Sequence, residues 1–175
     1  RRRALGFLRR HAQEGRQSYI ICPMIDEGDD DRASVTEYAA RLRTEELPSL
    51  RIGELHGRMK PAEKEEVMTR FASGDLDILV STTVVEVGVD VPNAVVMMIE
   101  NAERYGLSQL HQLRGRVGRG PHQSYCILFT DAQNPESVSR LQVLCPTTAG
   151  FSVAALALPR LGPVRSLDGR RPARP

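Results

Sequence analysis

The chain has 175 residues, of which 41% are hydrophobic and 26% are charged, and its formal net charge is +2. This composition is typical of a globular domain and excludes collagen-like and wholly disordered chains. No apolar run reaches the roughly 18 to 20 residues of a membrane-spanning helix, and the basic start lacks the apolar stretch of a signal peptide, so we expect a cytoplasmic protein without a membrane contact.

Residues 1–15 predict a basic helix that Gly15 closes. Residues 1–16 carry six arginines and one glutamate, and residues 156–175 carry five arginines and one aspartate, so the two ends are +5 and +4 and the chain between them is −7. Because the basic character comes from the ends, net charge alone does not argue for nucleic-acid binding. Such binding has to rest on local sites.

Five apolar segments predict strands, at residues 18–25, 51–55, 77–81, 94–99 and 124–129. They are nearly continuous in Val, Ile and Leu, which is typical of strands buried on both faces. Between them, helical spacing predicts helices around Val35 to Leu42, from Pro61 to Gly74 and over residues 108–117. This alternation predicts an α/β fold with a parallel sheet, in which functional residues follow the strands.

The cysteines and histidines are widely spaced and form no C-x-x-C pair. We therefore expect neither a disulfide framework nor a metal site. Asp26 to Asp29 spells an acidic Mg²⁺-binding box, but the chain has no Gly-Lys pair and so no phosphate-binding loop. An acidic loop is the better interpretation of that segment.

The clearest functional motif is the glycine- and arginine-rich segment at residues 109–120. Arg116 and Arg119 are three residues apart, and Gly115 and Gly118 repeat that interval. A glycine within a helix costs about 1 kcal/mol relative to alanine, which close approach of another surface would explain. Guanidinium groups suit bidentate phosphate contact and can stabilise a phosphoryl group in transfer. A solvated basic helix end is the alternative.

Two further segments follow predicted strands. Thr82 and Thr83, then Gly88 and Asp90, follow the strand at residues 77–81. Their hydroxyls suit a nucleic-acid phosphate and the carboxylate a ribose hydroxyl, although helix capping by the threonines and turn chemistry at Asp90 account better for this segment when it is taken alone.

His56, Gly57 and Arg58 lead from a strand into the helix that begins near Pro61. A helix N-terminus favours an anion such as phosphate. A plain strand-to-helix connection is the alternative.

Together these segments resemble the second RecA-like lobe of superfamily 2 helicases, and RecG-type ATP-dependent DNA helicases in particular. The resemblance rests on an H-G-x-M element at residues 55–71, motif V at 78–92 and motif VI at 112–119. It rests also on the amino-acid sequences of residues 22–25 and 100–109. It implies a RecA-like three-layer domain, a P-loop NTPase-like fold that lacks its own P-loop.

The implied organisation has four parts. They are a basic helix at 1–15, the helicase C-terminal lobe at 16–135, the start of a translocation region at 136–157, and a poorly ordered aberrant tail at 158–175. The family pattern is lost after Ala154, which we interpret as a reading-frame slip or a degraded gene end.

The resemblance also implies residue roles. Arg116 and Arg119 correspond to arginine fingers that reach ATP, and the other nucleotide-side positions are Gln112, Gly88 and Asp90. Positions along the DNA backbone are Thr82, Thr83, His56, Gly57 and Arg58. The implied function is remodelling of branched or forked DNA in repair and recombination, with ATP and Mg²⁺.

The implied partners are an N-terminal RecA-like lobe, which would supply the Mg²⁺ ligands, and a wedge domain. Neither lies within these 175 residues, so we expect no ATPase activity from the chain alone. The alternatives are a DNA-binding or regulatory module that hydrolyses nothing, and a lobe of a transcription-repair coupling translocase.

Overall fold

A computed structural model describes residues 1–22, 31–82, 90–144 and 151–157. The helices are α1 (Arg2–Gln13), α2 (Asp31–Arg41), α3 (Pro61–Ala72), α4 (Leu107–Arg114) and α5 (Pro135–Gln142), with two short helical turns, η1 (Leu42–Glu46) and η2 (Ala102–Arg104). The strands are β1 (Gln17–Ile21), β2 (Ile52–Leu55), β3 (Ile78–Ser81), β4 (Ala94–Ile99), β5 (Ser124–Thr130) and β6 (Phe151–Ala157).

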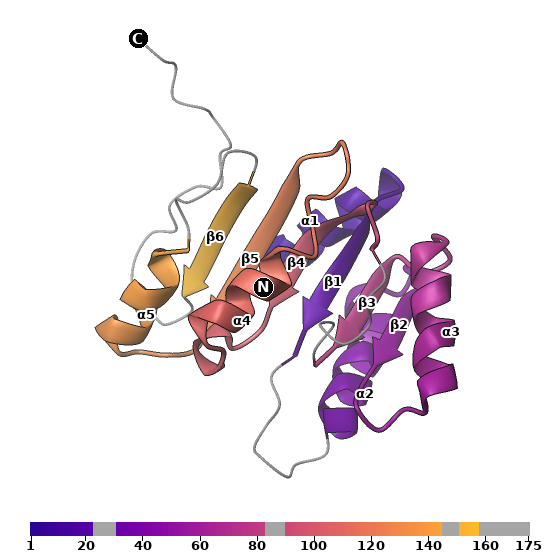
Figure 1. Cartoon of the computed structure of the whole chain (residues 1–175), viewed down its shortest axis with the longest axis horizontal. Helices are drawn as coiled ribbons and strands as arrows, with labels where there is room; N and C mark the ends of the chain where they lie inside the picture. The colour runs from indigo at the N-terminus through magenta and orange to yellow at the C-terminus, as the bar shows by residue number, and fades with distance from the viewer. Residues whose placement is uncertain (23–30, 83–89, 145–150, 158–175) are drawn as a thin grey trace.

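The six strands form one sheet in the order β2-β3-β1-β4-β5-β6, and every neighbouring pair is parallel (Figure 1). The predicted α/β fold with a parallel sheet is confirmed. The chain reverses its direction of progress across the sheet between β1 and β4, which places the switch point of the topology there. Neither α5 nor β6 was among the predicted elements.

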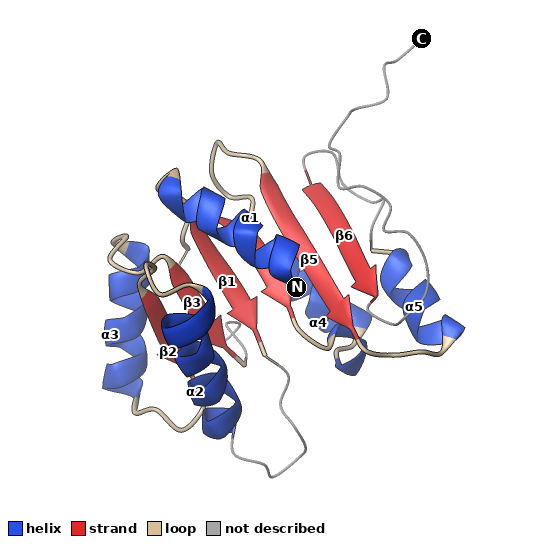
Figure 2. Ribbon diagram, turned by 180° about the vertical axis from the view of Figure 1, so that it is seen from behind, coloured by secondary structure: helices blue, strands red, loops and turns tan. Residues whose placement is uncertain are grey.

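The sheet is buried on both faces. Tyr19, Leu79 and Met97 lie side by side on one face and pack with α3, α4 and α5. The intervening residues point to the other face, under α1 and α2 (Figure 2). Burial on both faces removes the need for polar alternation, so the strands read as continuous apolar runs.

Glycines set two helix ends as predicted. Gly15 follows α1 with φ 81°, and Gly74 follows α3 with φ 87°, a region that side chains rarely adopt. The helix predicted over residues 108–117 was too long at its C-terminal end, because α4 stops at Arg114 and not near Val117. Gly118, with φ 83°, turns the chain away from a helical path.

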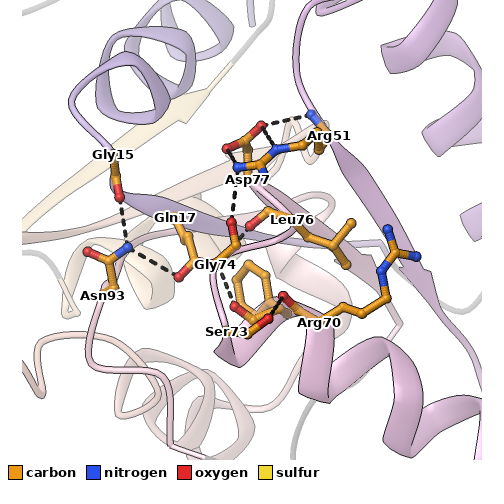
Figure 3. Close-up of polar contacts among 10 residues, drawn as sticks. Gly15, Gln17, Arg51, Arg70, Ser73, Gly74, Leu76, Asp77 and Asn93 are labelled. Carbon is orange, nitrogen blue, oxygen red and sulfur yellow. Dashed lines mark hydrogen bonds and ion pairs between the residues drawn. The ribbon is translucent and has the colours of Figure 1, made fainter.

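A buried amide joins three connections at the amino ends of the strands (Figure 3). The Gln17 Nε2 donates to the carbonyls of Phe71 at 2.5 Å and Leu76 at 2.7 Å. The Asn93 Nδ2 donates to the Gly15 carbonyl at 2.8 Å and to the Gln17 Oε1 at 3.2 Å. The residues that precede β1, β3 and β4 are thereby fixed relative to one another.

Candidate functional site

The carboxyl ends of the strands bring three predicted regions to one edge of the sheet. Leu55 of β2 pairs with Ser81 of β3, so His56 and Thr82 are neighbours beyond the strand ends. Thr82 is buried, His56 is half-buried, and Gly57 and Arg58, which follow it, are exposed. Thr83 and Gly88 lie outside the described residues.

Hydrogen bonds hold this edge in place. The Tyr105 hydroxyl donates to the carbonyls of Cys22 at 2.8 Å and Thr82 at 3.5 Å, and burial is the main reason why the pKa of that phenol is raised. The His56 backbone N–H donates to the Met59 sulfur at 3.4 Å. Within the described part of the chain, the His56 Nδ1 is buried without a hydrogen-bond partner.

The two predicted arginine fingers lie elsewhere. Because α4 follows β4 and precedes β5 of a parallel sheet, it runs back toward the amino ends of the strands. Arg116 and Arg119 come after α4, so the expectation that functional residues follow strands was wrong for them. Gln112 is exposed on α4 and Arg116 is half-buried just beyond it.

Arg119 meets Asp90, although 29 residues separate them in the sequence. Its Nη1 lies 2.5 Å from the Asp90 Oδ1, and its Nε donates to the Gly115 carbonyl at 2.9 Å. The Arg119 and Asp90 side chains are 45% and 58% exposed. The pair therefore leaves the guanidinium accessible, unlike a buried ion pair that would sequester it.

Tyr19 of β1 marks the face on which these charges gather. Burial raises the pKa of Tyr19 to about 12, the charges of Arg116 and Arg119 oppose that increase, and the charge of Asp90 adds to it. All three charges therefore lie within electrostatic reach of one phenol. Motifs V and VI thus meet over the sheet face that carries α3 and α4.

Two glycines of the arginine-rich segment are required, each for a different structural reason. A Cβ on Gly120 would collide with the Pro92 carbonyl oxygen, so this glycine permits the close approach of the two motif segments. Gly118 is needed for its positive φ. The close approach predicted for Gly115 and Gly118 is not seen at Gly115, whose Cβ would meet only carbonyls of its own segment, and the close contact is the one at Gly120.

Sequence reasoning missed a cavity of about 290 Å³ at the switch point between β1 and β4, lined in part by Tyr38, Arg41 and Glu100. Glu100 is 4% exposed and accepts a hydrogen bond from the Tyr38 hydroxyl at 2.8 Å. Burial, then the Glu100 charge, raises the pKa of Tyr38. The available signal was that Glu100 directly follows a strand at the switch point.

Among the residues that the structure describes, no helix has the length and apolarity to cross a membrane. No three His, Cys, Asp or Glu side chains of these described residues converge as metal ligands would. Cys22 and Cys126 are buried thiols, and burial raises the pKa of Cys22 to about 12.

Residues 2–121 match the family model of the helicase conserved C-terminal domain. The chain is 51% identical over 171 residues to the ATP-dependent DNA helicase RecG of Synechocystis sp., an alignment that covers 96% of this chain and 20% of that protein. It is 45% identical over 162 residues to RecG of Bacillus subtilis, covering 92% of this chain and 24% of that protein. The chain thus spans a fifth to a quarter of the length of these curated relatives.

A solved structure of RecG bound to a three-way DNA junction is similar with a TM-score of 0.71 and 44% identity, over 85% of this chain and 19% of that one. The C-terminal domain of Saccharomyces cerevisiae Dbp5 is similar with a TM-score of 0.60 at 13% identity, over 89% of this chain and 84% of that one, which supports the fold alone. The predicted RecA-like fold is thereby confirmed. The chain belongs to the helicase conserved C-terminal domain family, and its relatives within that family are RecG ATP-dependent DNA helicases.

Proposed function

We propose that this chain is the second motor lobe of an ATP-dependent DNA helicase that remodels branched DNA in repair and recombination, in the cytoplasm. The observation that carries the proposal is the meeting of Arg119 and Asp90, whose side chains are both exposed. The identity to RecG helicases and the similarity to a junction-bound RecG support the same assignment.

Arg116 and Arg119 would bind the phosphates of ATP held by a second lobe that docks beside the exposed Arg119–Asp90 pair, with the exposed Gln112 beside the nucleotide. An exposed ion pair such as Arg119–Asp90 is worth about 0.2–1 kcal/mol. Arginine fingers in other nucleotide hydrolases contribute about 10³–10⁵ in rate, roughly 4–7 kcal/mol. Breaking the Arg119–Asp90 pair so that Arg119 can bind phosphate therefore costs less free energy than an arginine finger contributes.

DNA would contact a different part of the lobe. His56, Gly57, Arg58 and Thr82 lie together beyond β2 and β3, where hydroxyl, guanidinium and backbone donors can contact phosphates. Thr83 and Gly88 belong to the same proposal through motif V. The chain from Thr82 to Asp90 begins at the DNA edge and ends beside Arg119, so it joins the two proposed sites covalently.

The remaining parts of the motor would come from outside this chain. It has no Gly-Lys pair, so a phosphate-binding loop and the Mg²⁺ ligands would be supplied by an N-terminal RecA-like lobe. Mg²⁺ would neutralise developing phosphate charge, while Arg116 and Arg119 orient the phosphates from the opposite side. A wedge domain would select the branched DNA.

The test measures ATP hydrolysis and binding to a labelled three-way junction. We expect no hydrolysis by the chain alone, and an ATP-dependent gain in junction affinity when the N-terminal lobe is supplied in trans. Arg116→Ala should remove the gain, whereas Arg70→Ala, on the exposed outer side of α3, should retain it. Junction binding that responds neither to ATP nor to Arg116→Ala would refute the motor and favour the DNA-binding module.

A further inference from the structure

Helix α1 presents a surface of arginines on its outer side. Its twelve residues include Arg2, Arg3, Arg9 and Arg10 and contain no acid. All four arginines are exposed, while Ala4 and Leu8 pack into the core beneath them. The polar side of this amphipathic helix therefore carries only positive charge.

The four arginines form two parallel pairs. Residues seven apart in an α-helix lie within about 20° of each other around the axis and about 10.5 Å apart along it. Arg2 and Arg9 make one such row, and Arg3 and Arg10 the other. Phosphates of one strand of duplex DNA rise about 3.4 Å per nucleotide along the helix axis, so the two arginines of a row are far enough apart to contact different phosphates.

Contacts within the folded domain do not explain Arg2 and Arg3. Among the residues that the structure describes, no acid pairs with either side chain. By contrast, Arg9 donates to the Glu46 carbonyl at 2.8 Å, and Arg10 lies 5.2 Å from the ring centre of Phe7.

The first turn of α1 lies at the carboxyl edge of the sheet. Arg1 pairs with Glu100 at 3.0 Å and with Asp131 at 3.7 Å, and these acids directly follow β4 and β5. His56 and Thr82 follow β2 and β3 at the same edge. Figure 2 shows α1 running from there across the face opposite α3 and α4, so α1 and the arginine fingers lie on opposite sides of the sheet.

We propose that the outer face of α1 is a second DNA-contact surface, which binds the phosphate backbone of a duplex arm as it leaves the carboxyl edge. The inference rests on the proposed function and extends it. A duplex is favoured over a single strand because single-strand sites present aromatic rings for base stacking. The aromatic residue of α1, Phe7, packs inward against His11 and Tyr125. A surface of arginines alone contacts phosphates and reads no sequence.

The test titrates the 175-residue chain onto a labelled duplex and a labelled three-way junction between about 50 and 200 mM salt, without nucleotide. Each lost phosphate contact lowers the slope of log affinity against log salt by about 0.9. Arg2→Gln with Arg3→Gln should therefore lower the slope by about 1 to 2 and weaken binding several-fold. Lys64→Gln with Arg70→Gln on α3 removes the same charge from the opposite face, and should leave the slope unchanged.

An unchanged slope in the α1 variant, or an equal loss in both double variants, would overturn the inference. A greater loss on single-stranded DNA than on duplex would overturn the choice of partner. Arg58→Ala separates this result from the proposed function, because Arg58 lies at the carboxyl edge and not on α1. If Arg58→Ala weakens binding and the α1 variant does not, the second surface fails alone. If neither weakens binding, the proposed DNA edge fails as well.

Discussion

Replacing Gln17 by leucine tests the network that fixes the amino ends of the strands. The side chain is 3% exposed and donates to the carbonyls of Phe71 and Leu76. In the variant the Phe71 carbonyl would keep a second donor, the Gly74 backbone N–H at 3.1 Å. The Leu76 carbonyl is therefore the main acceptor that would lose its hydrogen bond. An orphaned buried carbonyl costs about 1–3 kcal/mol, and each further lost hydrogen bond about 0.5–1.5 kcal/mol.

We therefore expect Gln17→Leu to lower the free energy of unfolding by about 2–4 kcal/mol, measured by urea denaturation at pH 7. Gln13→Leu is the matched control, because Gln13 is exposed at the end of α1 and should change stability by under about 0.5 kcal/mol. A loss below about 1 kcal/mol for Gln17→Leu would mean that water replaces the amide and that the network does not fix these connections.

Three further outcomes follow from the same structure. Gly120→Ala should lower the melting temperature, because its Cβ would collide with the Pro92 carbonyl, and an unchanged value would show that the two segments separate freely. Asp90→Ala should lower the unfolding free energy by less than about 1 kcal/mol, since its pair with Arg119 is exposed; a larger loss in urea denaturation would make the pair structural. The pKa of His11 is lowered by burial and then by nearby arginine charge, so the unfolded chain binds the proton more tightly. Stability should be constant above about pH 6.5 and fall as the pH drops toward the folded-state pKa, and His11→Gln should flatten that fall between pH 7 and 5.

The sheet could be predicted from the sequence because strands that are buried on both faces have continuous apolar sequences. Residues 94–99 were predicted with the bounds of β4. β6 is rich in alanine and serine, which carry a weak strand signal, and it was not predicted. The glycines after Arg114 shortened α4, and helical spacing gives little weight to such a stop when apolar residues continue beyond it.

The sequence singled out candidate residues one by one, but it did not predict how they are arranged. Arg119 and Asp90 were both identified, yet their contact depends on α4 running back across the sheet, which no local pattern records. Glu100 was overlooked as a buried acid because its partner Tyr38 lies 62 residues away. Strand order decides both contacts, and the periodicity of a strand contains no information about its neighbours.

The connection from Thr82 to Asp90 has unequal attachments at its two ends. At Thr82 the carbonyl accepts a long hydrogen bond, at 3.5 Å, from the half-buried hydroxyl of Tyr105, whereas Asp90 is held by an exposed ion pair with Arg119. In the proposed motor, phosphate would compete with Asp90 for the same guanidinium, so ATP would release the Asp90 end. The end beside the proposed DNA edge would stay anchored, and a change at the nucleotide would reach the DNA through this connection. In the proposed motor, ATP and DNA would thus bind at separate parts of the lobe and would be coupled through one stretch of backbone.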